Sequence, residues 1–111
     1  MENKYQLELF LEFLKNPISL SDIETGELFT DIPVIDHDET VKRLNREIGQ
    51  LYSSYFEFDT HNQPCYFNKI QEKKDKDKML SLFTQLVQRL NEINDGSYVV
   101  VDLETKRIKA L

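Results

Sequence analysis

The chain has 111 residues, of which 40% are hydrophobic and 31% charged, with three glycines and three prolines. This length and composition fit a single domain over residues 1–111 and exclude a linker-rich or disordered chain. The single cysteine, Cys65, excludes an intrachain disulfide and a cysteine-rich zinc site, and no apolar stretch is long enough to span a bilayer. We therefore expect a cytoplasmic protein that has no contact with a membrane.

The net charge of −6 is distributed unevenly along the chain. Residues 1–40 hold ten acidic and two basic residues, which gives −8, whereas residues 41–111 hold ten acidic and twelve basic residues, which gives +2. An asymmetry of this kind between the two halves of a chain can indicate an interaction surface.

The first predicted element is a helix over residues 4–15. Apolar residues recur at helical spacing from Leu7 to Leu14, and an Asn-Pro pair at residues 16 and 17 is a typical helix stop. The same stretch also alternates as a strand would, and only Phe10 breaks that alternation. The content of Leu, Glu, Gln and Lys favours the helix.

Residues 18–35 are expected to form extended chain with one tight turn. Glu24, Thr25 and Gly26 are typical turn residues, and Gly26 is free to adopt a positive φ. Pro33 favours an edge strand or a loop for the stretch that follows the turn.

Two further helices are predicted, at residues 38–54 and 76–94. Each carries a stripe of apolar side chains at helical spacing, and each begins in a region rich in charged residues. The stretch between them, residues 57–74, is compatible with a short hairpin or an ordered loop. The stripes consist of Val41, Leu44, Ile48, Leu51, Tyr52 and Tyr55 in the first helix, and of Met79, Leu82, Phe83, Leu86, Leu90 and Ile93 in the second.

The last predicted strand covers residues 98–103, where three consecutive valines indicate a buried strand. A turn over residues 102–106 and a return strand over 107–111 are expected to follow. The predicted fold is α+β, with three helices packed on a small, mainly antiparallel sheet in the order α-β-β-α-α-β-β.

A short pattern occurs twice in the chain. The segments Asp22–Leu28 and Asp102–Ile108 share the order Asp, apolar, Glu, Thr, two variable residues, apolar. We interpret both as the same hairpin turn, with Gly26 and Lys106 at the position where φ can be positive.

Residues 98–105 also resemble the first metal-binding motif of the DEDD exonucleases, an apolar strand that ends in Asp-x-Glu. The resemblance implies Mg²⁺ held by Asp102 and Glu104 for phosphoryl transfer. Those nucleases need further aspartates downstream, and none of the residues after Glu104 is acidic. A metal-dependent hydrolase that uses this pair is therefore the most remote of three hypotheses.

Other sequence motifs for catalysis, metal binding or phosphate binding are weak or missing. His61 and Cys65 lie four residues apart without a second pair of ligands, so we interpret them as a loop histidine near a buried cysteine. The sequence has no glycine-rich phosphate loop and no basic groove. We expect no enzyme activity, no cofactor, no bound metal and no direct contact with nucleic acid.

The acidic segment, residues 22–39, is the strongest candidate for function because it contains no Lys or Arg. A surface of one sign attracts an oppositely charged partner and speeds association. The leading hypothesis is a non-catalytic binding module that docks on a basic surface of a partner protein. By analogy of class, such a module is an inhibitor, immunity or anti-defence regulator of a nucleic-acid-handling protein. The candidate docking residues are Asp22, Glu24, Glu27, Asp31, Asp36, Asp38 and Glu39.

The second hypothesis is an accessory or structural subunit that binds through an apolar face. It depends on a dense group of aromatic residues in the middle of the chain. These residues are Tyr52, Tyr55, Phe56, Phe58, Tyr66 and Phe67.

Overall fold

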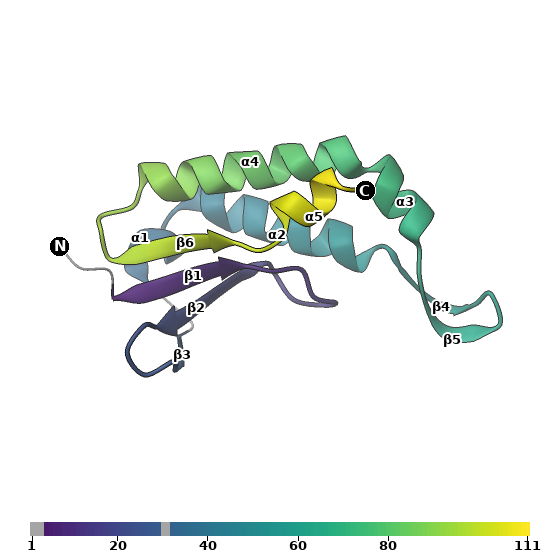
Figure 1. Ribbon diagram of the computed structural model, residues 1–111, viewed down its shortest axis with the longest axis horizontal. Coiled ribbons are helices and arrows are strands. Elements are labelled where there is room, and N and C mark those ends of the chain that lie inside the picture. Colours follow the sequence, from purple (N-terminus) through teal and green to yellow (C-terminus); the bar gives the residue numbers. More distant parts are fainter. Residues whose placement is uncertain (1–3, 30–31) are drawn as a thin grey trace.

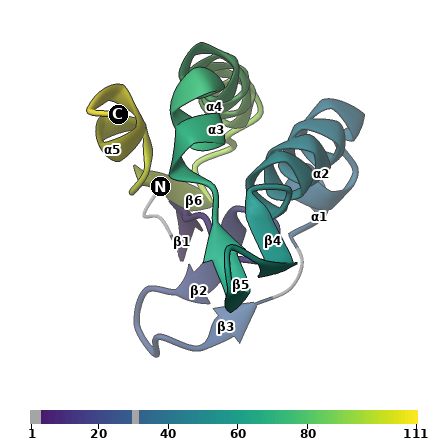
Figure 2. The same cartoon turned by 90° about the vertical axis from the view of Figure 1, so that its right-hand side faces the viewer.

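The computed structural model describes residues 4–29 and 32–111, and its main body has two layers (Figure 1). One layer is a four-stranded sheet in the order β3-β2-β1-β6. Its strands are β1 (Tyr5–Leu9), β2 (Ile18–Asp22), β3 (Leu28–Phe29) and β6 (Tyr98–Asp102). The other layer contains α2 (Glu39–Ser53), α4 (Lys76–Glu92) and α5 (Thr105–Lys109), which lie side by side above the sheet in Figure 2. The α+β class is confirmed, although the helices are more numerous and the order differs from the predicted one.

The predicted helix over residues 4–15 is wrong, because β1 is a central strand of the sheet. It pairs antiparallel with β2 on one side and parallel with β6 on the other. Leu7 and Leu9 are fully buried against the helices, whereas Phe10 is 44% exposed on the opposite face. Backbone pairing on both edges outweighs the helix propensity of this stretch, which is a weak preference of at most about 1 kcal/mol per residue.

The predicted strands and turn of residues 18–29 are confirmed. β2 and β3 pair antiparallel, and Gly26 in the turn between them has a φ of +73°. The stretch after Pro33 forms the short helix α1 (Pro33–Asp36) and not an edge strand or a loop. Proline suits this place because its missing N–H lies in the first helical turn, where that donor has no partner within the helix.

The helices predicted at residues 38–54 and 76–94 are confirmed as α2 and α4. Asp38 caps α2, where its carboxylate accepts a hydrogen bond from the N–H of Val41 at 2.9 Å. The apolar stripes of both helices pack on the inner face of the sheet to form one core. Its buried members from the sheet and these two helices include Leu7, Leu9, Leu20, Val41, Leu44, Ile48, Met79, Phe83, Leu86, Leu90 and Tyr98.

The stretch between these helices contains a hairpin and one further helix. β4 (Phe56–Thr60) and β5 (Gln63–Phe67) form a separate two-stranded sheet, which projects beyond the end of α2 (Figure 1). Its two-residue turn has positive φ at His61 and Asn62, 52° and 58°, as a type I′ turn requires. The chain then enters α3 (Lys69–Lys74), which Asn68 caps.

The strand predicted at residues 98–103 is confirmed as β6, but the return strand over 107–111 is wrong. The Asp102 carboxylate accepts hydrogen bonds from the N–H groups of Glu104 and Thr105, both at 2.9 Å, and α5 begins there. Asp22 makes the same pair of bonds at the β2–β3 turn, with Glu24 and Thr25. The repeated pattern thus encodes the same Asp-centred turn twice, but the predicted hairpin is right only for the copy with Gly26. Lys106 lies in the helix α5 and does not have the positive φ of Gly26.

Candidate protein-binding site

The exposed part of the acidic segment lies at the β2–β3 turn. Glu24 and Glu27 are both exposed there, and neither forms an ion pair within the described part of the chain. The Asp22 carboxylate is occupied by the backbone of the turn, at 2.9 and 3.1 Å from two N–H groups. Asp31 lies outside the described residues. The turn therefore presents two exposed carboxylates that have no ion pair among the described residues.

The carboxylates near α2 have a different environment. The Asp38 side chain is only 10% exposed and pairs with the Arg89 guanidinium, whose Nε lies 3.0 Å away. Hydrogen bonding with Arg89 holds the pKa of Asp38 below its usual value of 3.8, against the opposing effect of burial. This pair joins α2 to α4, so Asp38 has a structural role. Glu39 is exposed and lies 3.5 Å from Lys42, and Asp36 is partly buried in α1.

The two acidic groups lie at the same end of the long axis but on different sides of the sheet. Figure 1 places the β2–β3 turn and α1 at the end opposite the hairpin. Figure 2 shows the turn on the side of the sheet without helices, which we call the outer face, and α1 beside α2 on the other side. A partner on the outer face would therefore meet Glu24 and Glu27 before Asp36 or Glu39.

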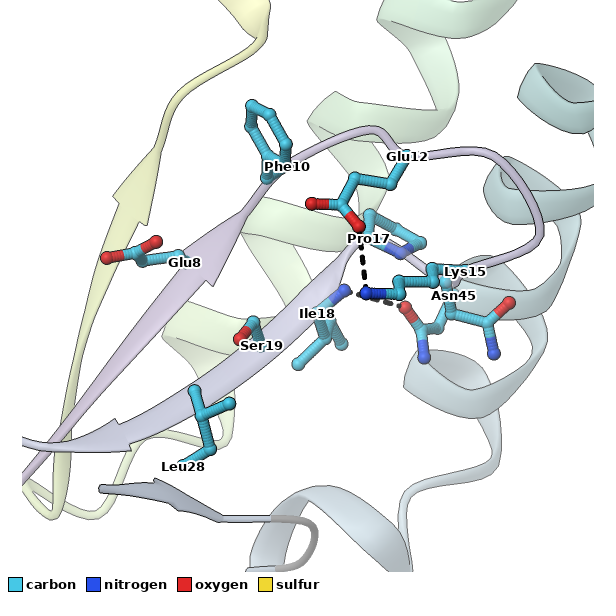
Figure 3. A pocket seen from close by; sticks show the side chains of 10 residues that line it. Glu8, Phe10, Glu12, Lys15, Pro17, Ile18, Ser19, Leu28 and Asn45 are labelled. Atoms are coloured by element: carbon cyan, nitrogen blue, oxygen red, sulfur yellow. Dashed lines mark hydrogen bonds and ion pairs between the residues drawn. The ribbon is translucent and has the colours of Figure 1, made fainter. Parts of the chain in front are cut away.

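The outer face also carries a pocket of about 540 Å³ that the sequence did not reveal (Figure 3). Because side chains alternate along a strand, Glu8 and Phe10 point outward while Leu7 and Leu9 point into the core. The signal for this pocket was the alternation of residues 5–13, which places Glu8 and Glu12 on one face if the segment is a strand. The pocket is lined by Glu8, Phe10, Glu12, Lys15, Asn16, Pro17, Ile18, Ser19, Leu28 and Asn45.

The loop between β1 and β2 builds one wall of this pocket. The loop is closed by a hydrogen bond from the N–H of Phe10 to the carbonyl of Pro17 at 3.0 Å. It is held to α2 by Asn45, whose side-chain oxygen accepts from the N–H of Ile18 at 3.1 Å. Gly49 permits close packing, since a Cβ there would lie 3.1 Å from the Cα of Asn16. The pocket wall is thus a fixed part of the fold.

The four strands below the pocket contain no Lys, Arg or His. Their charged residues are Glu8, Asp22 and Asp102, but only Glu8 lies on the outer face, because Asp22 is in register with Tyr5 and Asp102 with the inward-facing Leu9. Among the described residues Lys15 is the one cation that lines the pocket, and its Nζ lies 3.0 Å from Glu12 Oε2. The acidic side chains of the outer face are therefore Glu8 and Glu12 at the pocket and Glu24 and Glu27 at the turn, where the exposed Lys4 lies nearby and accepts the N–H of Ile23 at 3.0 Å through its carbonyl.

Of the aromatic residues of the second hypothesis, Tyr55 is buried, Phe58 is exposed, and the other four are half-buried. Tyr55 is only 1% exposed, and its hydroxyl donates to Asp75 Oδ2 at 3.0 Å, so it belongs to the core. Phe56 packs on Phe13 with ring centroids 4.5 Å apart. Phe58 is 54% exposed.

A second apolar side chain is exposed at the same end of the molecule. Leu14 is 78% exposed and has a φ of 63°, which is unusual for leucine. It follows Phe13, whose ring centroid lies 5.5 Å from that of Phe58. These residues form an apolar patch where the β1–β2 loop meets the hairpin.

The residues considered for catalysis or metal binding are mostly occupied by contacts within the fold. Glu104 is buried, and its carboxylate accepts from the N–H of Leu11 at 3.2 Å and from the Arg107 Nε at 2.7 Å. The His61 ring stacks on Tyr66 with centroids 3.9 Å apart, and Cys65 is exposed and not buried as expected.

Within residues 4–29 and 32–111, no three His, Cys, Asp or Glu side chains gather in a way that could hold a metal ion. None of the helices in these ranges has the length and apolar character needed to cross a membrane. The chain matches no protein-family model, no curated protein and no solved structure at a significant level.

Proposed function

We propose that this protein is a non-catalytic binding module that docks on a basic surface of a partner protein, as inhibitors and immunity proteins do. The observation that carries the proposal is the acidic outer face. Glu24 and Glu27 are exposed without an ion pair among the described residues, and the strands beside them contain no basic residue. Unpaired carboxylates of one sign on an open surface steer a basic partner toward it and raise the association rate.

The contacts of the other acidic residues restrict the docking surface. Asp22 and Asp38 are bound to the fold by their own hydrogen bonds, so reversing them would damage structure as well as binding. Glu24 and Glu27 can be reversed without removing such a contact of the carboxylate. They are therefore the residues that separate binding from stability.

The test compares two charge-reversed variants as baits for capture of partners from the native cell. The first is Glu24→Lys/Glu27→Lys, and the control is Asp77→Lys/Glu92→Lys, which makes the same charge change on exposed residues of α4. The control also removes a surface pair of Glu92 with Arg89 at 3.8 Å, so its folding is checked by circular dichroism as well. We expect wild type and control to retain the same protein and the first variant to lose it. With the captured protein purified, the first variant should associate at least about tenfold more slowly at low salt.

The dependence of association on salt concentration is the second measurement of the same experiment. Docking through charge should weaken steeply as the ionic strength rises, because exposed charges are screened beyond about 8 Å at physiological salt. Equal association of wild type and Glu24→Lys/Glu27→Lys, both folded by circular dichroism, would contradict the proposal.

A second candidate function is an accessory subunit that docks through the apolar patch of Leu14 and Phe58. Exposed apolar groups of this kind mark interaction sites, and Leu14 is placed by a turn in which the Lys15 N–H donates to the Glu12 carbonyl at 3.3 Å. Phe58→Ser should then abolish capture of the partner at any salt concentration, whereas Glu24→Lys/Glu27→Lys should have no effect.

A further inference from the structure

The outer-face pocket has the size and surroundings of a ligand site. Its volume of about 540 Å³ falls within the range of roughly 300–1,000 Å³ that is typical of small-ligand pockets. Its floor is formed by β1 and β2, and α2 contributes only Asn45. The floor of the site is therefore hydrogen-bonded sheet, and one wall is the β1–β2 loop.

The electrostatics of the pocket favour a cation. Glu8 and Glu12 against Lys15 leave one net negative charge in the lining. Within residues 4–29 and 32–111, the Glu8 carboxylate is engaged by the Gln6 amide, which donates to its Oε1 at 2.7 Å. Glu12 is engaged by Lys15, whose side chain is 72% exposed. A surface pair of this kind contributes at most about 1 kcal/mol, so an incoming cation can replace Lys15.

The apolar part of the lining favours a cation with a planar or aliphatic body. The Phe10 ring is 44% exposed between Glu8 and Glu12 along the chain, and Leu28 is 78% exposed on β3. A guanidinium group stacks on an aromatic face and donates in a fork to carboxylates, and its aliphatic stem covers apolar surface. An ammonium group uses the carboxylates but gains less from the ring.

We propose that this pocket receives an arginine side chain of the basic partner, with the guanidinium stacked on Phe10 between Glu8 and Glu12. The proposal rests on the proposed function, since it takes the partner surface to be basic. It adds a specific anchoring point to the general attraction of Glu24 and Glu27. Lys15 then acts as a competing cation of the chain itself, which occupies Glu12 until the arginine arrives.

The probe for this site is the peptide acetyl-Gly-Arg-Gly-amide, added to ¹⁵N-labelled protein and followed by NMR. We expect saturable shifts of the backbone amide signals of Phe10, Ser19 and Leu28. The same peptide with citrulline, which has the shape of arginine without its charge, should bind at least about tenfold more weakly. The affinity of the lysine peptide should lie between those of the arginine and citrulline peptides.

Three variants identify the residues that bind the peptide. Glu8→Gln/Glu12→Gln keeps the shape of the lining and should weaken binding at least about tenfold. The matched control, Glu24→Gln/Glu27→Gln, should change it by less than about twofold. Lys15→Gln removes the competitor and should tighten binding about two- to fivefold, the equivalent of a surface ion pair.

Three results would overturn the assignment. The first is equal amide shifts with the citrulline peptide and the arginine peptide. The second is arginine-induced shifts spread over Glu24, Glu27 and Glu39. The third is an unchanged affinity for the arginine peptide in Lys15→Gln. The outcome also separates the two proposals. If Glu24→Lys/Glu27→Lys slows association but the peptide does not bind the pocket, the docking function stands without the arginine site. If the peptide binds but Glu24→Lys/Glu27→Lys associates with the partner as fast as the wild type does, the docking proposal is wrong.

Discussion

Arg107 is predicted to hold together the end of the molecule where α3, α5 and the β1–β2 loop meet. Its Nη2 lies 3.0 Å from Glu72 Oε2, and its Nε lies 2.7 Å from Glu104 Oε2. The two carboxylates are almost buried, with side chains 8% and 5% exposed. Burial alone would lower the pKa of Arg107, but its hydrogen bonds to Glu104 and Glu72 raise it above the usual value. We therefore expect Arg107→Met to leave two buried charges without a counterion.

The expected loss of stability follows from this geometry. Removing one partner from a buried ion pair costs about 3–5 kcal/mol, because the remaining charge stays desolvated. The Arg107 side chain is itself 44% exposed, so solvent can reach the site and reduce that cost. We expect Arg107→Met to lower the free energy of unfolding by about 2–3 kcal/mol, a large share of the roughly 5–15 kcal/mol typical of a domain.

Urea unfolding followed by circular dichroism measures this effect, with Lys106→Met as the control. Lys106 is an exposed neighbour in α5 with no ion pair within the described part of the chain, and its removal should cost less than about 0.5 kcal/mol. Glu72→Gln provides the decisive comparison. It should destabilise the wild type by about 1 kcal/mol but stabilise the Arg107→Met variant, since it removes one of the two unpaired charges. Additive losses in the double variant would refute the reasoning.

Three further predictions concern single sites. Gly49→Ala should destabilise the protein by about 1 kcal/mol despite the better helix propensity of alanine, because the new Cβ would lie 3.1 Å from the Cα of Asn16; a gain in urea midpoint would contradict this. Asp38 has a lowered pKa because of Arg89, so its stabilisation is present above its unfolded value of 3.8 and is lost as the pH falls through the folded pKa. Asp38→Asn should therefore flatten the fall of stability in acid, and an unchanged acid unfolding curve would be evidence against this pair. Burial raises the pKa of Tyr98 from 10.0 to about 12. The contribution of its neutral hydroxyl to stability is therefore complete below pH 10.0 and is lost as the pH rises toward 12. Tyr98→Phe should reduce this alkaline loss of stability in a pH series of urea midpoints.

The elements predicted correctly are those whose pattern is long or chemically unambiguous. α2 and α4 keep one apolar stripe over four or more turns, which few other arrangements would bury. β6 was evident from its run of valines, and the β2–β3 turn from Gly26. The two Asp-centred turns were also correct as turns, because the side chain of each bonds to the backbone only two and three residues ahead.

The candidate site was predicted in part. Glu24 and Glu27 are exposed on a turn as the sequence indicated, whereas Asp38 serves as a cap and as the partner of Arg89, which lies 51 residues away. A contact over such a separation leaves no local pattern. The outer-face pocket was missed for the same reason as β1, since Glu8, Phe10 and Glu12 share a face only when their segment is a strand.

By itself the sequence determined the class of the fold, its two long helices, its valine-rich strand and the acidity of its first forty residues, because these depend on composition and on contacts within a few residues. Only the tertiary structure decided the state of residues 5–9 and the course of the chain after Asp102. The first segment is compatible with a helix or a strand until β2 and β6 supply partners for both of its edges. The second continues into α5 because Ile108 is buried in the core and Glu104 is held by Leu11 and Arg107, contacts that exist only once the chain has folded.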